Sequence, residues 1–315
     1  MHIPAAGARQ TLAASTPAAG GWAFTDDRGI TASFDHTPAS VVAAKHCAAG
    51  LWDFGFDVAG YFWGPPGGGP DIVSARTGFD TVPMISDGCA IDMEQMVSLK
   101  PDLVVDVDRT TGNVLSNVCA PGELAQIEAM SQTLSFSDVG VSRLRTIEKI
   151  GELAASLGAD IDTPDIQKAR STFMATQEAL DTAIQEKPGL RVLVLTILPD
   201  NAMVIVPHGW SDLTYYREQG ITFVDPSESD PTLTLSTTIS AEQLGEYPAD
   251  LIMLGDIGLQ SEDIATVNEV WSTLPAVQHG QVIPWPAHRA FSYQGFEPIV
   301  RAMADAVKRA EIVTD

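Results

Sequence analysis

The sequence predicts an α/β fold of two lobes joined by one long α-helix. First, residues 163–187 carry helix-capping signals at both ends and apolar residues at helical spacing. Second, residues 94–108 align without a gap onto residues 242–256, and both copies read as a short helix, a turn and a buried strand. Third, strand-like and helix-like segments alternate on both sides of the long helix. Two similar halves that flank one helix indicate two lobes.

The first half of the chain is expected to form the N-terminal lobe. Residues 1–22 are rich in small and polar residues without periodicity, so we interpret them as a flexible tether. The expected elements that follow are a hairpin over 22–34 with an acidic-glycine turn, a strand over 41–44, a helix from 45 to 55, a strand over 57–62 and a helix over 141–157.

Polar and aromatic residues gather where the N-terminal strands end. Ligands of open α/β sheets sit beyond the carboxyl ends of the strands, so these positions are candidate ligand-binding residues. They are Lys45, Tyr61, Trp63 and Arg109. A glycine-rich loop follows Trp63, but it lacks the Gly-Lys-Ser/Thr ending of a phosphate-binding loop. Core packing is the alternative for the aromatic residues.

The long helix has a clear start and end. Thr163 is a candidate N-cap, Pro164 suits the first helical position, and Asp165 places a carboxylate near the positive end of the helix dipole. A Pro-Gly pair at 188–189 ends it. At about 1.5 Å per residue the helix reaches roughly 37 Å, enough to lie along two lobes. An ordinary helix within a single α/β domain is the alternative, and the internal repeat decides against it.

The second half of the chain repeats the α/β pattern. Strands are expected over 191–196, 203–206, 221–224, 251–254 and 282–285, with a final helix that ends near residue 312. Aromatic or basic residues again follow the strands, which suits a bulky, mostly apolar ligand with a few polar points. The candidates are His208, Trp210, Arg289, Phe291 and Tyr293. The expected organisation is therefore a tether (1–22), an N-terminal lobe (23–162), an inter-lobe helix (163–187) and a C-terminal lobe (188–315).

Composition excludes several classes of protein. The 315 residues carry a net charge of −23, which disfavours binding to nucleic acid, and no apolar run is long enough for a membrane span.

The three cysteines, Cys47, Cys89 and Cys119, show no metal or redox spacing. A Cys89–Cys119 disulfide is compatible with an exported protein, whereas buried free thiols are the alternative that we favour. The N-terminus shows no charged-then-apolar signal segment, as expected of a processed or a cytoplasmic chain.

Catalytic patterns are weak. Ser211 follows Gly209 as in a nucleophile elbow, but the closing glycine is missing. Three histidines, His46, His208 and His288, all fall at strand ends, where hydrogen-bonded imidazoles are commoner than a metal site. Asp106 and Asp108 share one strand face, and we interpret them as solvated carboxylates rather than a catalytic pair.

Several motifs together resemble one family. These are the hairpin at residues 25–29, the strand–helix–glycine opening that ends at Gly55, the Leu-Lys-Pro-Asp-Leu core at 99–103 and the Trp-x-x-Leu-Pro-Ala-Val run at 271–277. From about residue 22 to its end, the chain resembles the solute-binding proteins of ABC importers for iron-siderophores, haem and cobalamin. The resemblance implies two Rossmann-like lobes, one rigid inter-lobe helix and a ligand cleft between the lobes. It implies a binding protein without a cofactor and not an enzyme.

The resemblance also implies partners and a location. One glutamate on each lobe of such proteins docks into arginine pockets of the membrane permease, and the matching motif positions here are Glu94 and Glu242. Family members are periplasmic or lipid-anchored at the outer face of the cytoplasmic membrane. The anchoring cysteine is missing near the start of this sequence, so a lipoprotein state rests on the resemblance. We expect a monomer.

Charge narrows the expected ligand. Only 18 lysines and arginines occur in the chain, and few lie at strand ends, so a strongly anionic ferric tris-catecholate fits poorly. We favour a ferric hydroxamate or mixed-type siderophore, with Arg109 and Arg289 on the chelating oxygens and Trp63, Trp210 and Tyr293 along the apolar arms. Haem and cobalamin are the alternatives within the family. A metal-dependent enzyme on a two-lobed α/β fold, with His208 and Asp256 near the metal, is the alternative from another class.

Overall fold

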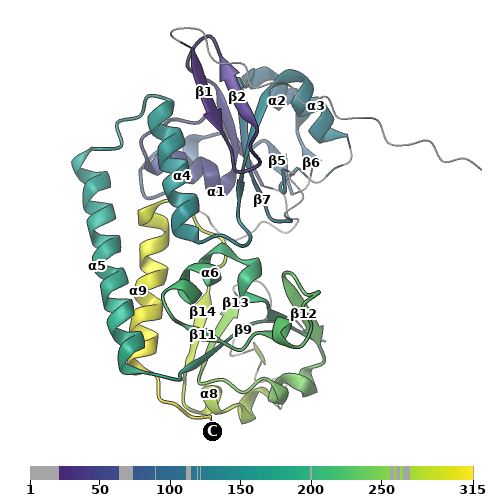
Figure 1. Ribbon diagram of the computed structural model, residues 1–315. Helices are drawn as coiled ribbons and strands as arrows, with labels where there is room; N and C mark the ends of the chain where they lie inside the picture. The colour runs from purple at the N-terminus through teal and green to yellow at the C-terminus, as the bar shows by residue number, and fades with distance from the viewer. Residues whose placement is uncertain are drawn as a thin grey trace, which may run out of the picture.

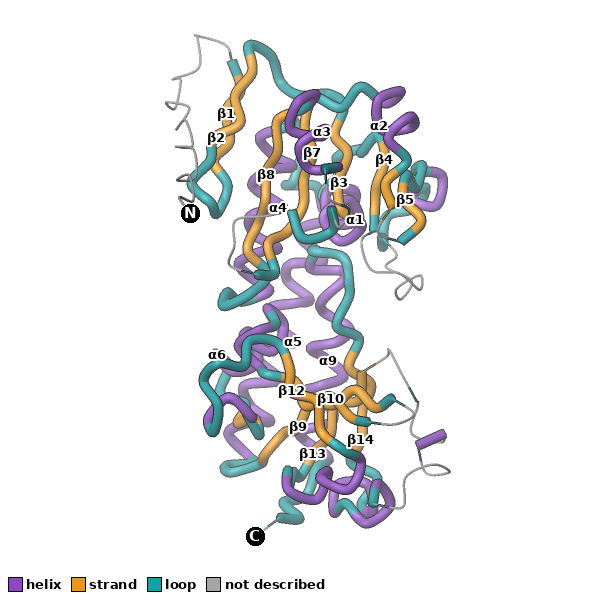
Figure 2. The backbone as a smooth tube through the Cα atoms, turned by 90° about the vertical axis from the view of Figure 1, so that its right-hand side faces the viewer, coloured by secondary structure: helices purple, strands orange, loops and turns teal. Residues whose placement is uncertain are grey.

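Two α/β lobes lie one above the other in the computed structural model, and a pair of helices runs along one flank of both (Figure 1). The structure describes residues 21–63, 74–88, 90–110, 115–118, 120, 122–198, 201–255, 259, 263–264 and 270–314. Residues 1–20, which cover most of the expected tether, lie outside this range. The turned view of Figure 2 shows the two lobes at opposite ends of the molecule. The predicted fold class is confirmed.

The N-terminal lobe is built on a parallel sheet with the order β4-β3-β7-β8. Its strands are β4 (Gly60–Phe62), β3 (Val41–Ala44), β7 (Leu103–Asp108) and β8 (Gln132–Ser137). Small antiparallel pairs are formed by β1 (Trp22–Thr25) with β2 (Thr31–Phe34) and by β5 (Ser86–Asp87) with β6 (Ala90–Ile91). The helices are α1 (Lys45–Asp53), α2 (Met93–Leu99), α3 (Glu123–Met130) and α4 (Arg143–Ser156). Strands β3 and β7 are buried on both faces, as expected of a parallel sheet.

The hairpin at the start of the lobe is attached to the sheet by Asp26. Its buried carboxylate accepts hydrogen bonds from the backbone N–H groups of Arg28 and Ile30 inside the turn and from the N–H of Ser135 on β8. Gly29 closes the turn with φ of +75°, which a side chain would strain. The acidic-glycine motif therefore sets both the turn and its attachment.

The C-terminal lobe has a mixed sheet with the order β12-β10-β9-β13-β14, with β11 also paired to β9. Its strands are β9 (Arg191–Ile197), β10 (Ala202–Ile205), β11 (Thr222–Phe223), β12 (Ser236–Ile239), β13 (Leu251–Gly255) and β14 (Val282–Trp285). The helices are α6 (Ser211–Glu218) and the short α8 (Pro275–Gln278), with 3₁₀ turns at Phe79–Thr81, Pro207–Gly209, Pro226–Glu228, Ala241–Glu246 and Trp271–Thr273. The internal repeat corresponds to α2 with β7 in one lobe and to the 3₁₀ turn Ala241–Glu246 with β13 in the other.

The long helix α5 (Pro164–Glu186) starts and ends within one residue of the predicted bounds. It lies beside α9 (Tyr293–Arg309), as both views show. Phe173 of α5 stacks on Phe296 of α9, and the Thr176 hydroxyl donates to the buried carboxylate of Glu297 across 2.6 Å. From the sequence we expected the final helix to belong to the C-terminal lobe. Instead it begins against the N-terminal lobe, where Tyr293 packs on Phe54, and it gives the inter-lobe helix a second, parallel support.

Candidate functional site

The carboxyl ends of the parallel strands in the two lobes meet at the junction between the lobes. On the N-terminal side, α1 follows β3 directly, and Trp63, Arg109 and Asp138 follow β4, β7 and β8. On the C-terminal side, His288 comes shortly after the parallel strand β14, whereas Trp210 follows β10, which runs antiparallel to its neighbours, and lies at the junction beside His288. This edge of an α/β sheet is where ligands usually bind, which makes the junction the candidate functional site.

Aromatic and imidazole rings from both lobes form one cluster at this junction. The His46 ring lies 4.7 Å from the Trp63 ring and 5.5 Å from that of His288. His288 in turn lies 5.2 Å from Trp63 and 6.1 Å from Trp210. Phe291 stacks under His46 at 5.3 Å. Trp63, His46 and His288 are buried, whereas Trp210 is half-buried. The cluster therefore offers Trp210 as its partly exposed aromatic surface.

Charged groups beneath the rings join the two lobes. Arg109 places Nη2 2.9 Å from His46 Nε2 and donates from Nε to Asp138 Oδ2 across 3.3 Å. The hydroxyl of Ser211, the first residue of α6, donates to the other oxygen of Asp138. Arg143 on α4 donates from Nε to Ser211 Oγ across 2.6 Å and from Nη2 to the carbonyl of Ala287 across 3.3 Å. These hydrogen bonds connect α4 and the strand ends of one lobe to α6 and the segment after β14 in the other.

Burial controls the charges of this cluster. It lowers the pKa of His46 well below the usual histidine value, and the neighbouring Arg109 guanidinium lowers it further. Burial also lowers the pKa of His288 to about 3, with Arg109 again opposing protonation. A neutral His46 presents a lone pair on Nε2, which accepts the hydrogen bond from Arg109. Both imidazoles are therefore neutral at neutral pH, and the charge of the site resides on its arginines and aspartates.

A second carboxylate completes the C-terminal side of the cluster. Asp212 accepts a hydrogen bond from the indole N–H of Trp285 across 2.8 Å and lies 3.6 Å from Arg143 Nη2. Burial raises the pKa of Asp212, and Arg143 opposes that rise. Trp285 also packs edge-on against Trp210 at 4.9 Å, so the pair of Asp212 and Trp285 supports the partly exposed indole of Trp210.

The remaining predicted ligand residues lie around this cluster. Lys45 places Nζ 6.0 Å from the ring of Tyr61, which stacks on Phe79. Arg289 is partly exposed and donates to the carbonyl of His288 across 2.9 Å, and it has no carboxylate partner within the described residues. The His208 carbonyl accepts from the N–H of Gly140 across 3.1 Å, which adds a backbone contact between the lobes.

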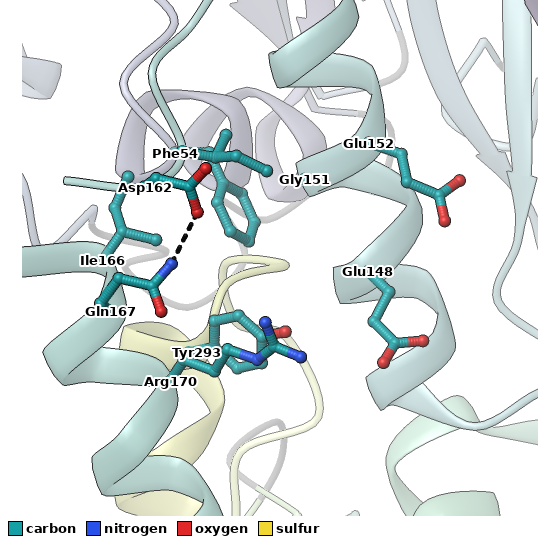
Figure 3. A pocket seen from close by; sticks show the side chains of 10 residues that line it. Phe54, Glu148, Gly151, Glu152, Asp162, Ile166, Gln167, Arg170 and Tyr293 are labelled. Atoms are coloured by element: carbon teal, nitrogen blue, oxygen red, sulfur yellow. Dashed lines mark hydrogen bonds between the residues drawn. The ribbon is translucent and has the colours of Figure 1, made fainter.

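Phe291 and Tyr293 are buried in the protein interior, as Trp63 is. Phe291 is fully buried under His46, so it supports the cluster from behind. Tyr293 packs between Phe54 and Phe173 and lines a separate cavity of about 390 Å³ between α4 and α5, shown in Figure 3 together with Arg170. The structure thus groups Tyr293 with the helix pair and not with Trp63 and Trp210.

The aspartates of β7 correct one expectation. Asp106 and Asp108 were expected to be solvated, yet both are buried. Asp106 accepts hydrogen bonds from the backbone N–H of Val107 and from the N–H and side-chain amide of Asn117. Burial raises the pKa of Asp106 to about 6, and the hydrogen bonds from Asn117 partly oppose this rise. Ser116 and Asn117 lie against the end of β7, which the strand pattern alone did not reveal.

Other expectations have mixed outcomes. Cys47 is a buried free thiol, as favoured, whereas Cys89 and Cys119 lie outside the described residues. The glycine-rich loop after Trp63 and Asp256 also lie outside that range. His46 and His288 come together, but within the described part of the chain no three metal-ligating side chains gather. None of the described helices combines the length and the apolar composition that a bilayer crossing requires.

Sequence reasoning missed the residues that join the lobes. Asp138 and Arg143 were not candidates, although Arg143 lies in a predicted helix, and Ser211 was considered only as a nucleophile. Strand β8, which delivers Asp138, was also missed. Its sequence Gln-Thr-Leu-Ser-Phe-Ser places Leu134 and Phe136 two positions apart between polar residues. That alternation is a strand signal, and it identifies Asp138 as a further residue at a strand end.

Comparisons with known proteins identify a family and several solved structures that are similar to this chain. A family model described as periplasmic binding protein matches residues 44–288. The solved structure of DesE, a ferric-siderophore receptor protein from Streptomyces coelicolor, is 30% identical, with a TM-score of 0.83 over 93% of this chain and 100% of that chain.

Two structures from Staphylococcus aureus share the fold at lower identity. SirA, complexed with staphyloferrin B, is 14% identical with a TM-score of 0.64 over 92% of this chain and 99% of its own. FhuD2, with bound ferrioxamine B, is 13% identical with a TM-score of 0.61 over 86% of this chain and 99% of its own. The search of curated proteins found no match. Because the family model spans most of its length, this chain belongs to the periplasmic binding protein family.

Proposed function

We propose that this protein is an extracytoplasmic solute-binding protein that captures a ferric siderophore at the inter-lobe junction and delivers it to an ABC permease. The observation that carries this proposal is the similarity to the ferric-siderophore receptor DesE along nearly the whole chain. The junction supports it, because aromatic surface and arginine side chains meet there at the carboxyl ends of both sheets. A binding role, not catalysis, is consistent with this family.

The charge balance of the junction favours a ligand of low charge. Arg109 and Arg143 are already paired with the carboxylates of Asp138 and Asp212, which leaves Arg289 as a cation without a carboxylate partner in the described range. A tris-catecholate complex would bring several negative charges next to these buried aspartates, in a chain of net charge −23. A ferric hydroxamate or mixed-type chelate avoids this repulsion. FhuD2, which shares this fold, holds ferrioxamine B, and this supports the choice of ferrioxamine B as a test ligand.

Each candidate residue has a proposed role. Arg109 and Arg289 donate to the iron-chelating oxygens of the siderophore through their guanidinium groups. Trp63 and Trp210 cover the apolar arms, with Lys45, Tyr61 and His208 at the edge of the site. Phe291 supports the site from inside the protein, whereas Tyr293 packs with the helix pair α5 and α9. Glu94 and Glu242, which are both exposed and lie in the first turn of their helices, are the proposed contacts to the permease.

The binding experiment compares chelates of different charge. Purified protein is titrated with ferrioxamine B loaded with Fe(III), a ferric tris-catecholate, haemin and cobalamin while tryptophan fluorescence is followed. We expect quenching by the ferric hydroxamate at micromolar concentration or below and much weaker responses to the others. Tight binding of haemin or cobalamin alone would assign the protein to one of the alternatives within the family. No response to any of the four would contradict the proposed function.

A further inference from the structure

Asp138 receives hydrogen bonds from both lobes at once. Its Oδ2 accepts from Arg109 Nε across 3.3 Å within the N-terminal lobe, and its Oδ1 accepts from the hydroxyl of Ser211 in the C-terminal lobe. Asp138 and Ser211 are both buried. One carboxylate therefore links a candidate ligand-binding arginine to the opposite lobe.

Arg143 strengthens this link from the other direction. It belongs to α4 of the N-terminal lobe, is only 2% exposed, and donates its hydrogen bonds to Ser211 and Ala287 of the C-terminal lobe. Its guanidinium also lies over the ring of Phe291 at 4.9 Å. A buried guanidinium that loses its partners is costly, so rotation of one lobe against the other is opposed at this point.

The same contacts fix the position of Arg109. Its guanidinium is held between Asp138 and the neutral His46, so it has little rotamer freedom while Asp138 stays in place. Ser211 donates to Asp138 from the opposite lobe, so this hydrogen bond depends on the present orientation of the two lobes. Arg109, Asp138 and Ser211 thus form a chain of contacts across the junction, which we name the junction relay.

We propose that Ser211 is a positioning residue: through Asp138 it holds Arg109 in the orientation that binds the ligand, and it sets the relative orientation of the lobes. The ligand contact of Arg109 rests on the proposed function, whereas the effect on lobe orientation does not. Ser211→Ala removes the donor to Asp138 and the acceptor for Arg143 without adding bulk. Ser211→Thr retains the hydroxyl and serves as the rescue variant.

Thr176→Val is the matched control. Thr176, like Ser211, is buried and donates its hydroxyl to a buried carboxylate, in this case Glu297 between α5 and α9. It lies outside the junction relay. If a general loss of stability explained the effects of Ser211→Ala, Thr176→Val would show the same effects.

Two measurements test the proposal. The first is the distance distribution between spin labels on the exposed positions Glu128 and Glu246, one in each lobe, measured without ligand. The second is the affinity for ferrioxamine B loaded with Fe(III). We expect Ser211→Ala to broaden the distances and to weaken binding about tenfold or more, because a charge-assisted hydrogen bond is lost. Ser211→Thr and Thr176→Val should resemble the wild type in both measurements.

The outcomes distinguish a failure of the proposed role of Ser211 from a failure of the proposed function. Unchanged distances in Ser211→Ala would overturn the proposal, even if its affinity fell. Equal broadening in Thr176→Val would also overturn it, because the effect would not be specific to the junction. If Ser211→Ala does not fold, Asp138→Asn takes its place with the same expected broadening. If the wild type binds none of the chelates, the proposed function fails, while the ligand-free distances still decide whether the lobes are held by Ser211.

Discussion

His46 of the N-terminal lobe and His288 of the segment after β14 face each other, with Nε2 of the first 3.4 Å from Nδ1 of the second. Both rings are buried, and Arg109 lies 2.9 Å from the same nitrogen of His46. A proton on either ring would place a second cation beside Arg109 in a poorly solvated site. The contact between the lobes therefore depends on two imidazoles that remain neutral.

Acid is expected to weaken this contact. Burial lowers the pKa of His288 to about 3, against about 6.5 in an unfolded chain. Below pH 6.5 the unfolded chain therefore binds a proton that the folded protein does not, and the free energy of unfolding falls as the pH falls towards 3. The wild type should lose about 2–3 kcal/mol more than His288→Gln between pH 7 and pH 4.5. Urea unfolding at both pH values measures this difference. Equal losses in the two proteins would contradict it.

Asp106 should give a pH dependence of opposite sign. Burial raises its pKa to about 6 from 3.8, so the folded state retains the proton longer than the unfolded state. The free energy of unfolding should therefore be unaffected by this shift below pH 3.8 and should fall by about 3 kcal/mol as the pH rises through 6. Asp106→Asn should remove this slope. Below pH 3.8 the variant should be about 1 kcal/mol less stable than the wild type, because an amide cannot accept all the hydrogen bonds from Asn117, and this deficit should reverse as the pH rises through 6.

The comparison between Asp106→Asn and the wild type isolates this group from the other carboxylates. Urea unfolding free energies are measured at intervals between pH 4 and pH 7, and their difference is plotted against pH. A difference that does not change with pH would show that Asp106 titrates as it does in the unfolded chain. A difference that changes in the opposite direction would contradict the sign of the shift.

Helices and strands were predicted well where a local pattern of apolar residues or of helix-end signals marks them. The strand over Val41–Ala44 was predicted because it is an apolar run between turn signals, and all four residues are buried. The bounds of α5 were predicted because Pro164 and the Pro-Gly pair that follows the helix act locally. Trp63 and Arg109 were predicted near the junction because the carboxyl ends of parallel strands carry ligand-binding residues. Trp210 also lies there, although the strand that it follows, β10, runs antiparallel to its neighbours.

Contacts between distant segments could not be predicted in this way. Ser211 and Asp138 are 73 positions apart, and neither has a local feature that identifies its partner. The final helix has the amphipathic pattern of any surface helix, so its packing against α5 and the N-terminal lobe was not visible. Asp106 looked like an exposed carboxylate because the covering segment around Asn117 has no strand or helix signal.

Replacement of Trp210 should weaken ligand binding. Its indole is the partly exposed aromatic surface of the junction, and Trp285 and His288 hold it in place. Trp210→Ala should lower the affinity for ferrioxamine B loaded with Fe(III) about tenfold, through lost aromatic contact area. Trp52→Phe is the control, because Trp52 lies on α1, where it contacts Arg76, Thr77 and Phe79. Isothermal titration calorimetry is the measurement, and equal affinities in both variants would remove Trp210 from the site.

Delivery to a permease should depend on Glu94 and Glu242 but ligand binding should not. Both glutamates are exposed. Glu94 lies in the first turn of α2, and Glu242 is the second residue of the 3₁₀ segment Ala241–Glu246. A carboxylate on each lobe offers two charges to arginines of a partner, and loss of either should weaken docking. Glu94→Ala and Glu242→Ala should each reduce siderophore-dependent iron uptake by cells about tenfold, and the double variant more, with unchanged affinity in calorimetry.

Two other exposed glutamates, one on each lobe, provide matched controls for this prediction. Glu128 is exposed on α3, and Glu246 is exposed at the end of the same 3₁₀ turn as Glu242. Alanine at either position removes the same charge from the same lobe, so uptake should stay at the wild-type level. If the control variants reduce uptake as much as Glu94→Ala and Glu242→Ala do, the effect comes from net charge and not from docking. If all four variants support normal uptake, neither glutamate contacts the permease.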